Sequence, residues 1–280
     1  MFSNQSLNLS TLKRLERKVI NLTEIALEKR IFSGECDYQK FLIICRKRTG
    51  SNFLVSLLQS HPKIRAFGEV FSEDDKIHWG YPSYSSPEIL QIRHKAPIEF
   101  IEHIVFRDFL KSTKAVGFKL IYQEKQSSNC KIIYEYLHSL KNLKVIHLKR
   151  RNIFSNYVSF KMAIKTDIWI KLRNEGSNNL KLKIDYEDCL DYFQQTRALE
   201  KKYELLFSNP SQQIHTLYYE DLVTNKVKAI EDLQEFLEVE CLPLVSYTRK
   251  QEKRPLSEIV INYNELKEKF ENTPWQSFFQ

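Results

Sequence analysis

The chain has 280 residues, 42% of them hydrophobic, which is enough to bury a sizeable core. Lys and Arg total 43 against 35 Asp and Glu, and the resulting net charge of +8 suits an anionic ligand, an acidic polymer or a membrane surface equally well. Five widely spaced cysteines form no zinc-ligand spacing, and no stretch approaches the roughly 18 apolar residues that span a bilayer. With no apolar signal segment at the N-terminus, these features argue against a metal site and predict a cytoplasmic protein, soluble or at most peripheral to a membrane.

Residues 1–35 are predicted to form an amphipathic helical extension. Apolar residues recur there at intervals of three and four between positions 7 and 31, namely Leu12, Leu15, Val19, Leu22, Ile25 and Leu27. Lysines and arginines between them give the helix a basic polar face. The helix therefore either packs on the rest of the chain, mediates a homodimer contact or lies on a membrane surface.

The remainder, residues 36–280, alternates short apolar runs with amphipathic stretches. The runs predict strands at 41–45, 115–118, 145–148 and 214–218, and a further strand after Pro62. The stretches predict helices at 53–60, 131–140, 154–164, 187–205 and 226–237. This alternation is typical of an α/β fold with a central, mostly parallel β-sheet flanked by helices. Because no low-complexity linker interrupts it, we expect a single domain.

The first predicted strand ends in a basic turn that leads into a helix. The turn and the start of the helix comprise Arg46, Lys47, Arg48, Thr49, Gly50, Ser51, Asn52 and Phe53. Gly50 lets the backbone curl closely around an anion, and the helix N-terminus contributes aligned amide groups. Ser51 and Asn52 either cap the helix or donate to phosphate oxygens. This pattern predicts a phosphate-binding turn, but not that of a nucleoside triphosphatase, because no glycine lies five residues before Gly50 and no lysine follows it.

Two further segments, together with this turn, resemble one known family. Residues 48–54, followed by Gln59-Ser-His-Pro62, resemble the 5'-phosphosulfate loop of sulfotransferases that use 3'-phosphoadenosine 5'-phosphosulfate (PAPS). Residues 144–159 resemble the 3'-phosphate site of the same family, which implies phosphate contacts from Ser159 and from Arg150 or the adjacent Arg151.

The C-terminal segment resembles the closing segment of bacterial Stf-zero and nodulation-type sulfotransferases, which act on lipopolysaccharides or glycolipids. This match covers residues 248–266 and Thr273-Pro-Trp275. Its cations, which would surround the phosphates of a bound nucleotide, are Arg249, Lys250, Lys253 and Arg254.

The resemblance implies a P-loop-like sulfotransferase fold and a reaction. The donor would be PAPS, the product 3'-phosphoadenosine 5'-phosphate, and the acceptor a hydroxyl-bearing saccharide, lipid or small molecule, with no metal and no nucleic acid. Arg48 would stabilise charge on the leaving group, and Glu69 would serve as the base. Burial between Phe67 and Phe71 would raise the pKa of Glu69.

Alternatives remain at several positions. His78, His94 and His103 are rival bases, and Glu69 is otherwise a structural carboxylate paired with Arg46, Lys119 or another cation. Trp79, Tyr81 and Tyr84 either line an acceptor pocket or pack in the core. The rival functions are a nucleotide- or anion-binding protein without transferase activity and a basic polyanion-binding protein.

Overall fold

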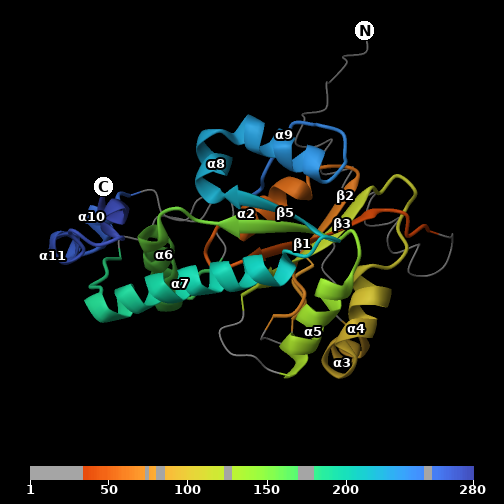
Figure 1. The fold of residues 1–280 in the computed structure, drawn as a ribbon, viewed down its shortest axis with the longest axis horizontal. Coiled ribbons are helices and arrows are strands. Elements are labelled where there is room, and N and C mark those ends of the chain that lie inside the picture. The colour runs from red at the N-terminus through yellow and green to blue at the C-terminus, as the bar shows by residue number, and fades with distance from the viewer. Residues whose placement is uncertain (1–33, 73–75, 80–85, 123–127, 170–179, 249–253) are drawn as a thin grey trace, which may run out of the picture.

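The computed structural model describes residues 34–72, 76–79, 86–122, 128–169, 180–248 and 254–280 (Figure 1). The expected N-terminal amphipathic helix lies almost entirely outside the described residues. None of the described helices is both long and apolar enough to cross a bilayer.

The described residues form one five-stranded parallel sheet of order β2-β3-β1-β4-β5. The strands are β1 (Gln39–Cys45), β2 (Ile64–Glu69), β3 (Ala115–Ile121), β4 (Lys144–Lys149) and β5 (Gln213–Tyr218). Strands β3 and β4 are buried along their whole length, whereas β5, at the edge, is mostly half-buried or exposed and fully buries only Leu217. Central strands with helices on both faces need continuous apolar runs, which is why the sequence pattern identified them. The predicted α/β architecture is therefore confirmed.

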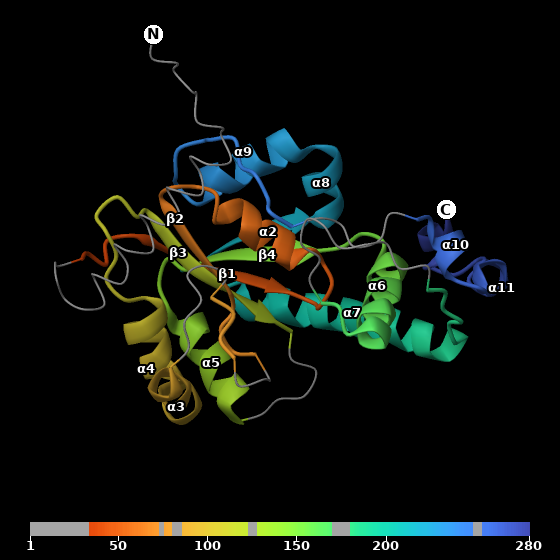
Figure 2. The ribbon, with the colours of Figure 1, turned by 180° about the vertical axis from the view of Figure 1, so that it is seen from behind.

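Helices cover both faces of the sheet (Figures 1 and 2). One face packs against α2 (Ser51–Leu58), α8 (Tyr219–Thr224) and α9 (Lys226–Phe236). The other packs against the π-helix η1 (Phe100–Val105), α5 (Ser128–Ser139) and the C-terminal half of α7 (Tyr186–Phe207), with α3 (Pro87–Lys95) and α4 (Pro97–Glu99) beside them. The five helices predicted within residues 36–280 are all present, while α3, α4, η1, α8 and the three short C-terminal helices after residue 254 were not predicted.

A third hydrophobic cluster lies beyond the sheet. It joins α6 (Ile153–Thr166) and the N-terminal half of α7 to the C-terminal helices α10 (Leu256–Ile259), α11 (Tyr263–Lys269) and η2 (Gln276–Phe279). Rings dominate this cluster; Phe154, for example, lies 4.5 Å from Phe279 between centroids. The packing fixes α6 next to the carboxyl ends of the strands.

The strand order places a crevice at the carboxyl ends of β1 and β3. Helix α2 follows β1 onto one face of the sheet, and α5 follows β3 onto the opposite face. In open parallel sheets, ligands bind where the chain diverges in this way. The two predicted basic turns follow β1 and its other neighbour β4, so both lie at this edge.

Candidate active site

The first basic turn is built around Gly50. This residue has φ 87° and ψ 17°, a left-handed conformation that glycine adopts without strain. A Cβ atom at Gly50 would lie 2.3 Å from Cδ2 of Tyr219, so the ring of Tyr219 leaves no space for a side chain. Gly50 is the N-cap of α2, and no side chain caps this helix. Of the two roles considered for Ser51 and Asn52, capping is therefore wrong.

The two predicted phosphate turns meet in space. Arg48 Nε donates to Ser159 Oγ at 3.1 Å, and Arg48 Nη1 donates to the carbonyl oxygen of Trp169. From the second turn, Arg150 Nη1 donates to the carbonyl oxygen of Arg48 at 3.3 Å. Residues separated by about a hundred positions in the sequence thus line one site.

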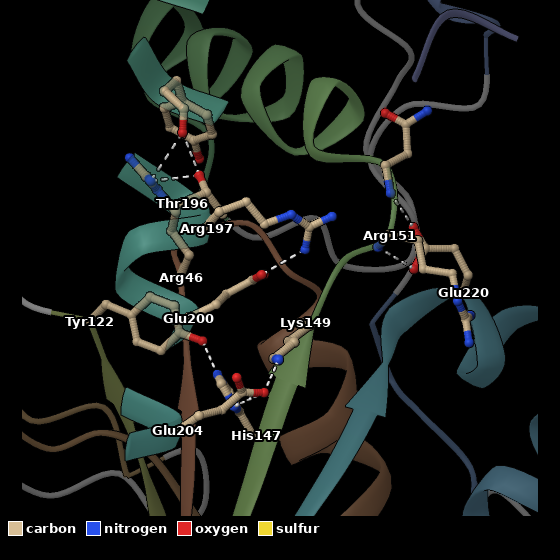
Figure 3. Close-up of polar contacts among 12 residues, drawn as sticks. Arg46, Tyr122, His147, Lys149, Arg151, Thr196, Arg197, Glu200, Glu204 and Glu220 are labelled. Atoms are coloured by element: carbon tan, nitrogen blue, oxygen red, sulfur yellow. Dashed lines mark hydrogen bonds and ion pairs between the residues drawn. The ribbon is translucent and has the colours of Figure 1, made fainter. Parts of the chain in front are cut away.

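Arg150 and Arg151 point in different directions. The Arg150 side chain is 14% exposed, and its guanidinium lies 5.0 Å from the ring centre of Tyr219. Its buried Nε lies 3.9 Å from Glu220 Oε1 and makes no hydrogen bond within the described residues. Arg151 instead pairs with Asp221 through two hydrogen bonds of 2.7 and 2.9 Å at the surface. The backbone N–H of Arg151 donates to Glu220 Oε2 at 3.0 Å (Figure 3). The geometry favours Arg150 as the arginine that faces the turn.

Positive charge is concentrated between these arginines. Burial, together with the neighbouring charge of Arg150, lowers the pKa of Arg48 to about 10. Burial likewise lowers the pKa of Arg150. Both groups remain protonated at neutral pH, so two guanidinium ions are held close together in a partly desolvated place. A phosphate or sulfate group beside them would relieve this repulsion.

Glu69 lies at the end of β2 and is linked to the phosphate turn through Lys119. Its Oε1 is 2.8 Å from Lys119 Nζ, which also donates to Asn52 Oδ1 at 2.6 Å. The Lys119 side chain is 3% exposed, whereas that of Glu69 is 31% exposed and accessible to a substrate. The proposed base, the lysine and the first turn of α2 therefore form one connected group.

The expectation that the pKa of Glu69 is raised is wrong. Burial does raise it, but the charge and the hydrogen bond of Lys119, with smaller contributions from His78 and Lys47, lower it below the usual value overall. The expectation about the pKa considered only the apolar sequence neighbours of Glu69. Of the cation partners considered for Glu69, the structure shows Lys119, which opposes it across the β2–β3 pair.

Other predicted phosphate ligands lie in various surroundings. The Arg46 guanidinium is buried against α7, where it donates to Thr196 Oγ1 at 2.6 Å and stacks 3.7 Å from the ring centre of Tyr192 (Figure 3). Thr49 Oγ1 donates within the turn, to the Arg46 carbonyl oxygen at 2.8 Å, and Phe53 packs partly buried on the α2 face of the sheet.

The predicted C-terminal cations are only partly described. Arg249, Lys250 and Lys253 lie outside the described residues. Arg254 donates to the carbonyl oxygen of Leu180 at 3.2 Å, which joins the C-terminal segment to the chain before α7.

The remaining candidates are partly resolved by packing. Trp79 is 2% exposed, with its ring 5.1 Å from that of Phe67, so it belongs to the core. Tyr81 and Tyr84 lie outside the described residues. Among the rival bases, His78 is exposed and its backbone N–H donates to the Glu69 carbonyl oxygen at 3.1 Å; His94 (on α3) and His103 (in η1) are also exposed.

Helix α7 contributes residues that the sequence analysis missed. Its polar residues Thr196, Glu200 and Glu204 recur every four positions and face the strands (Figure 3). Glu204 pairs with Lys149 at the end of β4 and lies 3.8 Å from His147 Nδ1 of the same strand. Burial lowers the pKa of His147 to about 3, so its ring is neutral, and its Nε2 is hydrogen-bonded to the Tyr122 hydroxyl. The four-residue spacing of polar groups on α7 was the available signal.

Known proteins resemble this chain over most of its length. Residues 41–243 match the Sulfotransferase family, which is well over half of the chain. Nodulation protein H of Rhizobium meliloti (strain 1021) is 27% identical over 247 residues, covering 86% of this chain and 95% of that protein. Nodulation protein H of Rhizobium tropici is 25% identical over 246 residues, covering 86% of this chain and 93% of that protein.

Two solved sulfotransferase structures are similar to this chain at low sequence identity. A sulfotransferase from Alicyclobacillus acidocaldarius superposes with a TM-score of 0.45 at 15% identity, covering 82% of this chain and 90% of its own. A mouse sulfotransferase in complex with PAP superposes with a TM-score of 0.42 at 12% identity, covering 93% of this chain and 94% of its own. On the family match over residues 41–243, the chain belongs to the sulfotransferase family and is a transferase.

Proposed function

We propose that the protein transfers a sulfuryl group from PAPS to a hydroxyl group of a glycolipid, a saccharide or another small molecule. The observation that carries this proposal is the meeting of the two basic turns, with Arg48 Nε 3.1 Å from Ser159 Oγ. A donor with phosphate groups at both ends of its ribose needs two anion sites separated by one sugar. Turns at the ends of the adjacent strands β1 and β4 provide two such sites.

The described residues fit a doubly phosphorylated nucleotide. Gly50 brings backbone amides, without a side chain, to the start of α2. Arg48 and Arg150 supply charge, and the buried Nε of Arg150 has hydrogen-bonding capacity left for an anion. Ser159 contributes a hydroxyl next to Arg48, and Arg249, Lys250 and Lys253 are proposed to complete the site from the C-terminal segment.

Chemically, the residues have separate tasks. Glu69 accepts the proton of the acceptor hydroxyl while that oxygen bonds to sulfur and the bond from sulfur to the phosphate oxygen breaks. Arg48 and Lys119 stabilise the negative charge that grows on the departing phosphate. Because the pKa of Glu69 is lowered, the carboxylate is ionised at neutral pH and ready to accept a proton. Positioning and charge stabilisation account for the rest of the rate.

The test is to measure formation of 3'-phosphoadenosine 5'-phosphate from PAPS with a panel of saccharide, glycolipid and small alcohol acceptors. We expect acceptor-dependent turnover, and we expect Glu69→Gln to lower kcat by roughly a hundredfold or more while its affinity for the bisphosphate product stays near that of the wild type.

His78→Gln is the matched control, because His78 is the rival base nearest to Glu69. This variant should retain its turnover. Collapse of turnover in His78→Gln, with an active Glu69→Gln enzyme, would assign the base to the histidine. Tight binding of the bisphosphate with no transfer to any acceptor would favour the nucleotide-binding alternative.

A further inference from the structure

The carbonyl groups of three consecutive turn residues are each held by a side chain. The Arg46 carbonyl oxygen accepts from Thr49 Oγ1 at 2.8 Å, that of Lys47 from Asn156 Nδ2 at 3.1 Å, and that of Arg48 from Arg150 Nη1 at 3.3 Å. The orientations of the three successive peptide planes are therefore fixed by side chains.

This arrangement determines where the amide groups point. In a trans peptide the N–H points away from the C=O of the same plane. Fixing the carbonyl oxygens of Arg46, Lys47 and Arg48 therefore directs the N–H groups of the next residues to the opposite side. Amide groups oriented before an anion arrives bind it without the cost of reordering the turn.

Asn156 depends in turn on Tyr192. Asn156 is 1% exposed on α6, and its Oδ1 accepts a hydrogen bond from the Tyr192 hydroxyl of α7. This bond sets the orientation of the amide, because the oxygen faces Tyr192 and the nitrogen faces the Lys47 carbonyl. The ring of Tyr192 also stacks on the guanidinium of Arg46 at 3.7 Å, so one side chain contacts the turn at two points.

We propose that Tyr192 and Asn156 are positioning residues, which hold the peptide planes of residues 46–48 so that their amide groups bind the 5'-phosphate end of the donor. The inference rests on the proposed function. It also changes the role of Arg46, whose buried guanidinium acts on the turn from the α7 side and is not a phosphate ligand.

A neighbouring tyrosine provides a matched comparison. Tyr157 lies on α6 with its ring centre 4.8 Å from that of Tyr192, and it is 3% exposed. Its hydroxyl is buried and has no hydrogen-bond partner within the described residues. Removing the hydroxyl from Tyr157 or from Tyr192 deletes the same atom in the same cluster, but only the second deletion reaches the turn.

The experiment compares the wild type, Tyr192→Phe and Tyr157→Phe by calorimetric titration with 3'-phosphoadenosine 5'-phosphate. Tyr192→Phe should bind about three- to tenfold more weakly, the effect of one lost buried hydrogen bond. Tyr157→Phe should bind like the wild type. Thermal unfolding of each variant, measured without the ligand, separates affinity from loss of fold.

Asn156→Leu, a nearly isosteric change, forms a double-mutant cycle with Tyr192→Phe. It should weaken binding at least as much, and adding Tyr192→Phe to it should cost little more, because the hydroxyl acts through Asn156. Additive effects of the two changes, or a lowered melting temperature at unchanged affinity, would overturn the inference. Failure of the wild type to bind the bisphosphate would refute the proposed function instead.

Discussion

At the scale of single residues, the main feature of the site is a carboxylate held by a buried lysine. Lys119 contacts both Glu69 and Asn52, so the proposed base and the start of the phosphate turn share one cation. The charge of Lys119 makes Glu69 a weaker base than a carboxylate in an apolar pocket, but one that is ionised over a wide range of pH. The Glu69 side chain is 31% exposed.

This pairing predicts a pH dependence. In the wild type, the pKa of Glu69 lies below its usual value, so activity should persist until acidic pH. In Lys119→Met the burial of Glu69 is no longer opposed by that charge, so its pKa should rise and the acidic limb of kcat/KM should move to higher pH. A profile measured between about pH 4 and pH 8 checks this.

The matched control is Lys144→Met. Lys144 is also buried, and it pairs with Glu238 at 2.6 Å at the start of β4, the opposite end of the sheet from the site. Its removal should leave the position of the acidic limb unchanged. An equal shift in both variants would show that the limb reports general destabilisation and not Glu69.

The adjacent arginines give a second prediction. Arg150→Ala removes a buried guanidinium that faces the turn, so affinity for 3'-phosphoadenosine 5'-phosphate should fall more than tenfold, as expected for a charge-assisted hydrogen bond. Arg151→Ala breaks a surface pair with Asp221 and should change that affinity less than about threefold. Equilibrium titration of both variants with the bisphosphate measures these affinities. A larger loss of affinity in Arg151→Ala than in Arg150→Ala would assign the 3'-phosphate to Arg151.

At the scale of elements, the turn between β1 and α2 depends on a ring from a distant helix. Tyr219, the first residue of α8, occupies the space where a Gly50 side chain would project and also lies over the guanidinium of Arg150. The turn, the end of β4 and α8 therefore pack as one unit. No local pattern around Gly50 indicates this dependence.

Gly50→Ala tests the packing of that unit. The left-handed φ and the contact with Tyr219 should together lower the free energy of unfolding by about 1–3 kcal/mol and weaken bisphosphate binding. In the Tyr219→Ala background the contact is absent, so the same substitution should cost less. Denaturant unfolding measures both differences; equal costs in the two backgrounds would show that backbone strain alone acts.

The elements that the sequence predicted and those it did not differ in their physical signals. Strand β4 and helix α6 have an apolar run and a clear helical periodicity, so both were predicted close to their bounds. Helix α3 packs Ile89, Leu90 and Ile92 only partly buried against the core, and its one fully buried residue is Arg93, so its apolar pattern is short and weak. Residues 100–105 form a π-helix, whose spacing matches neither the period of an α-helix nor that of a strand.

In the candidate site too, residues with a local sequence signal were predicted and residues without one were not. The residues of both basic turns were predicted, because strand, basic turn and helix occur consecutively in the sequence. Tyr219, Asn156 and Tyr192 were missed, because their importance comes from contacts across more than a hundred positions or between two helices. The pairing of Glu69 with Lys119 was among the alternatives considered, but its effect was left out of the predicted pKa, which was therefore wrong.

At the scale of the whole molecule, the close cations of the site are a source of instability that a ligand can remove. Bound 3'-phosphoadenosine 5'-phosphate at a hundred times its Kd should raise the free energy of unfolding by about 2.7 kcal/mol. At fixed ligand concentration the increase should shrink as salt is added, because charge dominates the affinity. Thermal unfolding measures both effects, with adenosine as the control; equal stabilisation by adenosine would contradict an anion site.

The strand order also has a consequence for synthesis of the chain. The turn at Gly50 leaves the ribosome early, yet the residues that hold it, Asn156, Tyr192 and Tyr219, follow much later, and β4 is inserted beside β1 only after β2 and β3 have been made. On the proposed function, a nascent chain that ends before residue 219 lacks a complete nucleotide site. Nucleotide then cannot assist the early stages of folding, and premature termination products should be unable to bind it.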